Sequence, residues 1–177
     1  MLFTGRGDGG TTSTFGRNEP RISKASDLPE ALGALDELNA YLGLVKMRGD
    51  AEPYIKSTLH AVQETLFIIQ AQVAGADKKV GEAVVKQIED FVALIEKRIP
   101  PLKGFSIAGG TELSAQLDVA RTLSRRTERR VVAVKEAGVR DLPAATMAYL
   151  NRLSSLLFAL ARFVNHRAGV VEENPSY

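Results

Sequence analysis

The chain has 177 residues, of which 45% are hydrophobic and 25% are charged, and its formal net charge is +2. These values are typical of a soluble globular protein, and we expect one domain over residues 1–177. The absence of cysteine excludes disulfides, thiolate metal sites and thiol nucleophiles, and two histidines are too few for a multi-histidine metal site. The near-neutral charge argues against nucleic-acid binding, which usually needs a broad basic surface.

The sequence also argues against a membrane protein. A membrane-spanning helix needs about 20 apolar residues, and the most apolar segment, residues 153–164, is interrupted by Ser154, Ser155 and Arg162. The N-terminus lacks the apolar core of a signal peptide. We therefore expect a cytoplasmic protein.

Glycine, proline and apolar spacing divide the chain into one non-helical segment and five helices. Residues 1–26 are rich in Gly, Thr and Ser and show no apolar periodicity, so we expect no helix there. Beyond them, a 3.6-residue apolar period predicts helices over residues 27–47, 53–74, 80–98, 111–137 and 141–169. Long helices with short connections indicate an all-α, antiparallel five-helix bundle over residues 27–169, followed by a tail at 170–177.

The segment from Phe3 to Ser13 contains four glycines and several hydroxyl side chains. Glycine permits positive φ and exposes backbone N–H groups, so such a loop can enclose phosphates, with Arg6 as a further donor. It is neither a P-loop nor a dinucleotide-binding fingerprint, because it lacks the Gly-Lys-Ser/Thr ending and a preceding strand. Composition alone favours a flexible N-terminal tail over a phosphate-binding loop.

The first predicted helix carries Gly33, Asp36, Ala40 and Gly43 on one face. Small residues allow another helix to approach closely, and a carboxylate buried on such a face needs a cationic partner. Two interpretations have equal weight. Asp36 either pairs with a cation of another helix or lies at the rim of the bundle.

Residues 121–130 contain five arginines and one glutamate within the fourth predicted helix. Arg121, Arg125 and Glu128 lie within roughly 60° of one another around the helix axis, and Arg129 lies beside them. The adjacent sector should face the core, and it holds Leu113, Leu117, Ala120 and Val131. Guanidinium groups bind phosphate or carboxylate through paired hydrogen bonds. A polyanion site at a helix seam or subunit interface and a solvated helix with internal ion pairs are about equally supported.

Two further patterns flank this helix. Phe105 and the pair Gly109-Gly110 precede it, and the simplest interpretation is that Phe105 plugs the end of the bundle while Thr111 caps the helix. The fifth helix carries a stripe formed by Asn151, Ser155, Phe158 and Arg162. Its polar groups need partners, which a nucleotide or, more often, a neighbouring helix supplies.

Five motifs follow one another along the chain, at residues 7–12, 36–39, 105–111, 121–129 and 149–154. They read Gly-Asp-x-Gly-x-Thr, Asp-Glu-Leu-Asn, Phe-x-x-x-Gly-Gly-Thr, Arg-x-x-x-Arg-Arg-x-Glu-Arg and Tyr-Leu-Asn-Arg-Leu-Ser. In this order they resemble the ATP:cob(I)alamin adenosyltransferases of the propanediol-utilisation type, over essentially the whole chain. The resemblance implies a ferritin-like bundle and a homotrimer with active sites between subunits. It also implies transfer of the 5′-deoxyadenosyl group of MgATP to the cobalt of reduced cobalamin, with release of triphosphate.

Carried over by position, the resemblance assigns roles to individual residues. The expected ATP-binding residues are Thr4, Gly5, Arg6, Gly7, Asp8, Gly9, Thr11, Thr12, Lys24, Arg125, Glu128, Arg129 and Asn151. The expected catalytic residues are Arg125, Glu128, Arg121 and Asp36. Glu128 would also help to hold Mg²⁺, and Arg121 would pair with Asp36 across the subunit boundary. Phe105 would occupy the lower face of the corrin.

The chain departs from the family pattern at two places. Gly5 stands where the family usually has Lys or Arg, and Arg6 follows it. Residues 105–108 read Phe-Ser-Ile-Ala where the family has Phe-Ile-Leu-Pro, so this loop lacks the stiffening proline.

The chemistry that the resemblance implies needs no protein nucleophile, because Co(I) itself attacks the substrate. This agrees with a chain that has no cysteine, and we expect His60 and His166 to be structural. The expected partners are a flavoprotein-type reductase and a cobalamin-dependent acceptor enzyme. The alternatives are a non-catalytic carrier of corrinoid or nucleotide, and a helical nucleic-acid-binding module.

Overall fold

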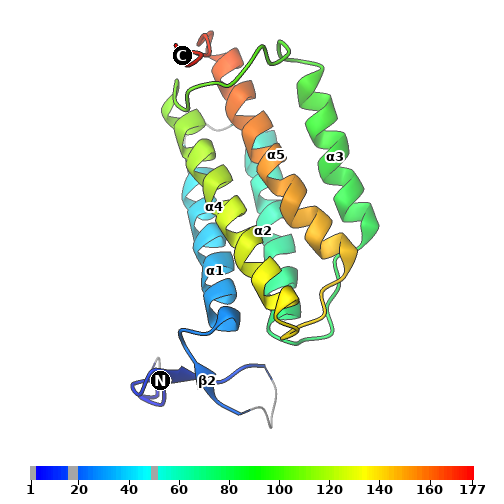
Figure 1. Cartoon of the computed structure of the whole chain (residues 1–177). Helices are drawn as coiled ribbons and strands as arrows, with labels where there is room; N and C mark the ends of the chain where they lie inside the picture. The colour runs from blue at the N-terminus through cyan, green and yellow to red at the C-terminus, as the bar shows by residue number, and fades with distance from the viewer. Residues whose placement is uncertain (1–2, 16–19, 49–51) are drawn as a thin grey trace.

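The computed structural model describes residues 3–15, 20–48 and 52–177. Its helices are α1 (Asp27–Lys46), α2 (Pro53–Val73), α3 (Glu82–Glu96), α4 (Glu112–Glu136) and α5 (Ala144–Arg167). They form an antiparallel bundle in which α4 packs against α1 and α5, α2 packs against α1, and α3 packs against α5 (Figure 1). The predicted all-α five-helix bundle is confirmed, and each helix lies within its predicted range.

The ends of the helices follow the glycine and capping signals in part. Thr111 caps α4 as predicted, because its Oγ1 accepts a hydrogen bond from the backbone N–H of Ser114 at 3.1 Å. Ser26 stands at the N-cap of α1, but its hydroxyl donates to the carbonyl of Ser23 and makes no cap bond. After α4, Gly138 adopts a φ of 67°, a conformation that favours glycine and ends the helix.

The core fills the space between α1, α2, α4 and α5. The four residues expected to face it from α4 are all buried, and they are Leu113, Leu117, Ala120 and Val131. Helix α3 contributes less, since Ile88 and Ile95 are its only buried residues. The face of α4 that carries the arginines therefore lies next to a packed seam, as its periodicity predicted.

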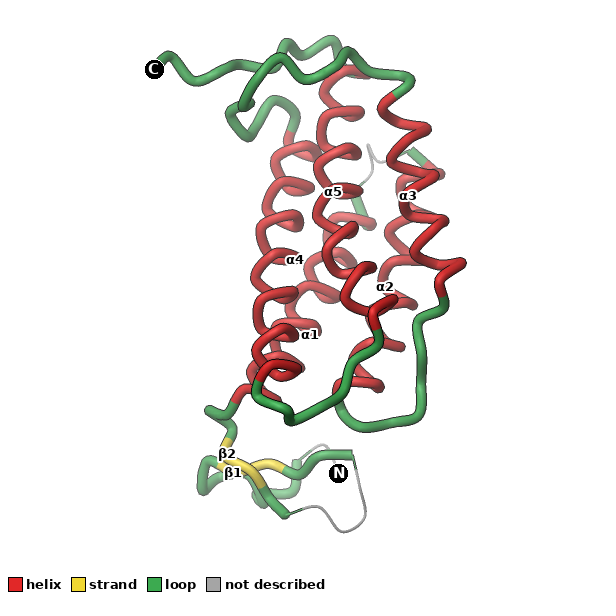
Figure 2. The backbone as a smooth tube through the Cα atoms, turned by 45° about the vertical axis from the view of Figure 1, so that its right-hand side comes forward, coloured by secondary structure: helices red, strands yellow, loops and turns green. Residues whose placement is uncertain are grey.

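The N-terminal segment lies beyond one end of the bundle, near the start of α1 and the end of α4 (Figures 1 and 2). Its described residues form no helix, as predicted. They do form a short antiparallel ribbon, in which β1 (Thr11–Thr12) pairs with β2 (Ile22–Ser23). This ribbon could not be predicted from the sequence, because two residues are too few for an alternating pattern to appear. Within the described ranges, no helix is both long and apolar enough to cross a membrane.

Candidate functional site

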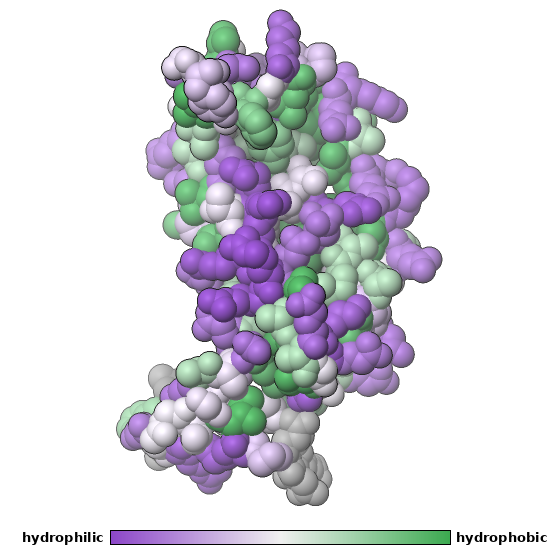
Figure 3. All heavy atoms as spheres, viewed as in Figure 1, coloured by the Kyte–Doolittle hydropathy of each residue, from purple (hydrophilic) through white to green (hydrophobic). Residues whose placement is uncertain are grey.

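A cavity of about 590 Å³ opens between α4, α5 and the loop that joins α3 to α4. Its lining residues are Leu102, Gly104, Phe105, Ser106, Arg121, Arg125, Ser154, Ser155 and Phe158. On the same face of the molecule, hydrophilic side chains gather along α4 (Figure 3). The cavity therefore offers guanidinium donors and aromatic rings to one ligand or to two neighbouring ones.

Phe105 projects from the α3–α4 loop and is 80% exposed. The interpretation that it plugs the end of the bundle is therefore wrong. Ile99, at the start of the loop, is buried instead and fills the core at that end. Phe105 is left free to line the cavity together with Phe158.

Arg121 is held in place by contacts within its own chain. Its Nε donates to Asp118 Oδ1 at 2.8 Å, and its guanidinium lies 5.7 Å from the centre of the Phe158 ring. An ion pair and a cation–π contact therefore fix the side chain at the wall of the cavity. Asp118 was not among the predicted site residues, although it lies three residues before Arg121 on the helix, a spacing that favours an ion pair.

Asp36 is exposed on α1 and forms no hydrogen bond or ion pair with any described residue. Within one chain, it therefore does not pair with Arg121, whose described carboxylate partner is Asp118. In the single chain, Asp36 therefore lies at the rim of the bundle, which was one of the two interpretations of the sequence. The pair between Asp36 and Arg121 of a neighbouring subunit stays a prediction.

The other four arginines of α4 fall into two groups. Arg126 and Arg130 form ion pairs with Glu37 and Glu30 of α1, so part of the run is a solvated, internally paired face. The side chains of Arg125 and Arg129 are exposed, and neither forms an ion pair or hydrogen bond with any described residue. Two guanidinium groups therefore remain available for an anion from outside the chain.

Glu128 and Asn151 meet between α4 and α5. The side-chain amide of Asn151 donates to Glu128 Oε1 at 2.9 Å. Its Oδ1 in turn accepts from Arg152 Nη1 at 2.8 Å, and Arg152 Nε donates to Glu89 Oε1 of α3 at 3.1 Å. Two predicted ATP-binding residues are thus brought together, and their orientation is fixed by a chain of polar contacts. Arg152 and Glu89 were not among the predicted site residues.

The glycine-rich N-terminal segment is a defined loop. Arg21 donates to Thr11 Oγ1 at 3.0 Å, to Ser13 Oγ at 3.1 Å and to the carbonyl of Arg6 at 2.7 Å. Lys24 lies over the loop, since a Cβ placed on Gly7 would be 2.9 Å from Lys24 Nζ. The structure thus brings Lys24 to the loop, and it adds Arg21, which no sequence pattern distinguished. Contact of Lys24 with phosphates stays a prediction.

The predicted ATP-binding residues form two separate groups in one chain. The N-terminal loop with Lys24 lies beyond the end of the bundle where α1 begins (Figures 1 and 2). The described residues that line the 590 Å³ cavity come only from α4, α5 and the α3–α4 loop. Arg125 and the N-terminal loop therefore do not share this cavity within one chain.

The described residues contain no group of three His, Asp or Glu side chains that could form a metal site of their own. Mg²⁺ bound to nucleotide phosphates does not need one, because it usually takes one or two carboxylates, the phosphates and water. Glu128, which lies beside Arg125 on α4, could supply one such carboxylate. The large pKa shifts lie elsewhere in the fold, where burial raises the pKa of Tyr149 and of Tyr54 to about 12.

The fold agrees with the class of protein that sequence comparison identifies. The sequence profile of the cobalamin adenosyltransferase family matches residues 2–164, and the chain belongs to this family. It is 36% identical to the corrinoid adenosyltransferase PduO of Salmonella typhimurium, with 97% of this chain and 53% of that protein covered. It is 37% identical to a corrinoid adenosyltransferase of Citrobacter freundii, with 91% of this chain and 93% of that one covered.

The chain spans about half the length of the PduO relatives that it matches. Among solved structures, it is similar to a single-residue variant of a PduO-type ATP:corrinoid adenosyltransferase from Lactobacillus reuteri complexed with cobalamin and ATP. The TM-score is 0.92 at 26% identity, and the match covers 99% of this chain and 97% of that one. The likeness therefore extends over the bundle, the N-terminal segment and most of the tail.

Proposed function

We propose that the protein transfers the 5′-deoxyadenosyl group of ATP to the cobalt of cob(I)alamin, forming adenosylcobalamin and releasing triphosphate. The observation that carries the proposal is the 590 Å³ cavity, in which Arg125 lies with Phe105 and Phe158. One cavity thereby offers a cation for a polyphosphate and ring faces for a large planar ligand. The family membership and the neighbour complexed with cobalamin and ATP support the same reaction.

The proposed reaction is a displacement at C5′ of ATP. The electron pair of Co(I) forms the cobalt–carbon bond, the C5′–O5′ bond breaks, and its electron pair leaves on the triphosphate. The protein's task is to align ATP for in-line attack and to stabilise the leaving charge. Arg125 and Arg129 are proposed for the second role, because their guanidinium groups have no partner among the described residues.

Glu128 and Asn151 are proposed to position the nucleotide. Their hydrogen bond of 2.9 Å presents one carboxylate at the α4–α5 seam. Glu128 would hold Mg²⁺, whose charge offsets that of the phosphates. The N-terminal loop from Thr4 to Thr12 and Lys24 are proposed to bind the phosphates through backbone N–H groups, hydroxyls and the ammonium.

Phe105 is proposed to act on the corrin side. An aromatic ring at the lower face would displace the lower ligand of cobalamin and leave four-coordinate Co(II), which is easier to reduce. The exposure of Phe105 at the cavity supports this role, because a ring buried in the bundle could not reach a ligand. Ser106 and Ala108 replace the stiffer family sequence on either side of Ile107, so the loop depends on other contacts for its position.

We propose that the active protein is a homotrimer with its active sites between subunits. The two groups of ATP-binding residues support this, since a neighbouring subunit could bring an N-terminal loop to Arg125. The exposed side chains of Leu44, Met47 and Phe67 also leave apolar surface for a subunit contact. Residues 1–177 would then act as one domain, in which residues 1–26 bind ATP, 27–169 form the bundle and 170–177 form the tail.

The remaining expectations concern the setting of the reaction. We propose a cytoplasmic location, a flavoprotein-type reductase that supplies Co(I), and a cobalamin-dependent enzyme that accepts the product. Membrane lipids and nucleic acids have no role in this scheme.

Anaerobic visible spectroscopy tests the proposed function directly. The protein is mixed with MgATP and chemically reduced cobalamin, and the Co(I) spectrum is followed. Its conversion to the spectrum of a light-sensitive alkylcobalamin is the expected result. A Co(I) spectrum that persists, in folded protein that binds ATP, would reject the transferase and favour a carrier of corrinoid or nucleotide.

A further inference from the structure

The chain that follows α5 folds back over the α3–α4 loop. The backbone N–H of Ile107 donates to the carbonyl of Glu173 at 2.8 Å. Within the described ranges, this is the only backbone–backbone hydrogen bond made by residues 99–110. The tail therefore holds the middle of the loop that carries Phe105, while α5 holds its end, where Asn165 Nδ2 donates to the Gly109 carbonyl at 2.8 Å.

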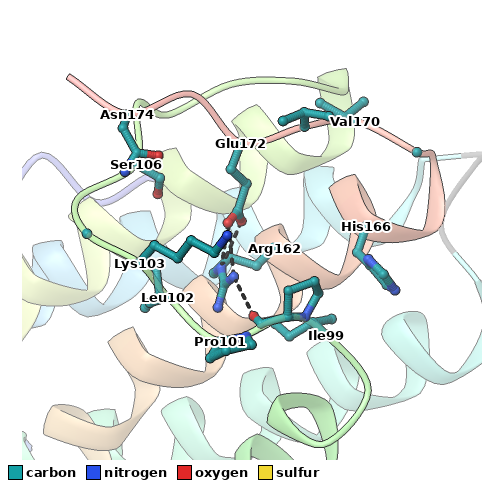
Figure 4. Close-up of a pocket in the computed structure, with 14 residues that line it drawn as sticks. Ile99, Pro101, Leu102, Lys103, Ser106, Arg162, His166, Val170, Glu172 and Asn174 are labelled. Atoms are coloured by element: carbon teal, nitrogen blue, oxygen red, sulfur yellow. Dashed lines mark hydrogen bonds and ion pairs between the residues drawn. The ribbon is translucent and has the colours of Figure 1, made fainter. Parts of the chain in front are cut away.

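One guanidinium joins the loop, the tail and α5. Arg162 Nε donates to both carboxylate oxygens of Glu172, at 2.8 and 3.0 Å, and its Nη2 donates to Glu172 Oε2 at 2.9 Å (Figure 4). The same Nη2 donates to the carbonyl of Pro100 at 2.9 Å. The two charged side chains are only 10% and 25% exposed. A multidentate pair with this little solvent is strong and directional, and removing one partner leaves the other charge without compensation.

The tail also contacts the loop immediately beside Phe105. A Cβ placed on Gly104 would lie 3.2 Å from Asn174 Nδ2, so the tail side chain packs closely over that glycine. The tail thus contacts the loop at Gly104 and Ile107, on both sides of Phe105, and Arg162 of α5 contacts it at Pro100. We call residues 170–174 the strap.

The loop forms a wall between two cavities. Leu102, Gly104 and Ser106 line the 590 Å³ cavity, and they also line a second cavity of about 470 Å³ that the strap residues border (Figure 4). A shift of the strap would therefore change the wall of the cavity that contains Arg121 and Arg125. Those two arginines lie on α4, which the strap does not hold.

We propose that Arg162 and Glu172 are positioning residues, which act through the strap to hold Phe105 in the cavity. The inference rests on the proposed function, since only that function gives Phe105 a role. Because the proposed phosphate ligands lie on α4 and in the N-terminal loop, loss of the strap should impair the use of cobalamin and spare the use of ATP. A merely structural pair would affect both substrates alike.

The test compares Glu172→Ala with Glu173→Ala in the full chain. The two glutamates are adjacent, but Glu173 contacts the loop through its carbonyl, which the substitution keeps. Hydrogen exchange of the Ile107 amide, followed by NMR without ligands, reports the position of the loop. Initial rates over a range of ATP and of reduced cobalamin give a KM for each substrate.

For Glu172→Ala, we expect the Ile107 amide to lose its protection while the helix amides keep theirs. We also expect KM for cobalamin to rise about tenfold, the scale of one lost charge-assisted contact, with KM for ATP unchanged. Glu173→Ala should match the unmodified protein in all three measurements. A chain that ends at Gly169 should behave like Glu172→Ala, whereas a chain that ends at Asn174 should not.

Unchanged Ile107 exchange in Glu172→Ala would overturn the inference, and so would equal losses for ATP and cobalamin. If the unmodified protein makes no adenosylcobalamin, the proposed function fails. Hydrogen exchange of the Ile107 amide then decides by itself whether the Arg162–Glu172 pair holds the loop. Retained protection of Ile107 in Glu172→Ala would then reject the strap, and lost protection would support it.

Discussion

Asn151 on α5 donates its side-chain amide to Glu128 on α4 across 2.9 Å, and its own oxygen accepts a hydrogen bond from Arg152. Both ends of the amide are therefore used, so its orientation is fixed. Arg152 is anchored in turn by Glu89 on α3. Three helices thus determine where the Glu128 carboxylate points, although the contacts themselves are exposed. Such an arrangement suits the role proposed for Glu128, because it presents the carboxylate to a metal–phosphate complex in one geometry.

Replacing Asn151 by Ala should therefore weaken ATP binding more than the chemical step. We expect KM for ATP to rise about tenfold, because charge-assisted hydrogen bonds contribute about 1.5–3 kcal/mol. The measurement is the initial rate as a function of MgATP. Arg152→Met should have a smaller effect in the same direction, since it removes only the restraint on Asn151. An unchanged KM for ATP in Asn151→Ala would contradict the role given to this pair.

Arg125→Ala should lower kcat/KM for ATP by about 100-fold, because it removes a cation proposed to stabilise the leaving triphosphate. Arg130→Ala is the matched control on the same helix, since Arg130 is 3.2 Å from Glu30 in an exposed ion pair. Such pairs contribute little to stability, so the control should fold and react normally. Steady-state rates with both variants decide the point. Equal activities of the two variants would show that Arg125 does not stabilise the leaving triphosphate.

Phe105→Ala should leave ATP binding intact and slow the formation of Co(I) from bound Co(II). The visible spectrum of Co(II)cobalamin bound to the variant should keep the features of the five-coordinate form, because no ring displaces the lower ligand. Leu94→Ala on α3 serves as a control for losing an exposed apolar side chain, since Leu94 is 45% exposed and lies outside the cavity. A Phe105→Ala spectrum identical to that of the unmodified protein would remove the corrin role.

Asp36→Ala should reduce the mass of the assembly from that of the proposed trimer toward that of one chain. Asp36 has no partner among the described residues, whereas the adjacent Glu37 pairs with Arg126 in its own chain. Glu37→Ala is therefore the control, and it should keep the trimer. Light scattering after gel filtration measures both masses. A stable trimer in Asp36→Ala would exclude the pair with Arg121 of a neighbour as a main contact.

Thr111→Ala should destabilise the fold by about 1 kcal/mol, the usual cost of losing a side-chain N-cap. The substitution removes the hydrogen bond that the Ser114 N–H donates to Thr111 Oγ1. Ser26→Ala should cost less, because the Ser26 hydroxyl makes no cap bond. Urea unfolding at one fixed protein concentration compares the two. A larger loss for Ser26→Ala would reverse the assignment.

The helices could be predicted because each one depends on local signals. The 3.6-residue apolar period shows which segments are helical. Local residues mark the helix ends, as Pro53 does at the start of α2 and Gly138 does after α4, and the observed helices begin and end there. The order of motifs likewise predicted the family. The position of Phe105 could not be predicted, because the sequence around an isolated aromatic residue does not indicate which other segments of the chain hold its loop in place.

The contacts that shape the site connect residues far apart in the sequence. Arg162 reaches Pro100 across 62 positions, and Arg21 reaches back to the carbonyl of Arg6 across 15. No periodicity encodes such a pair, since many arginines are available and their partners are backbone carbonyls. The same holds for the division of the α4 arginines, which depends on where the glutamates of α1 fall in the packed bundle.

The strap also sets an order of events during synthesis. Glu173 follows its partner Ile107 by 66 positions (173 minus 107), and α4 and α5 lie between them. The α3–α4 loop therefore leaves the ribosome well before the segment that anchors it. A nascent chain can form α1 to α3 and still have an unfixed cavity wall. The wall of the 590 Å³ cavity is therefore completed only after translation has passed the strap.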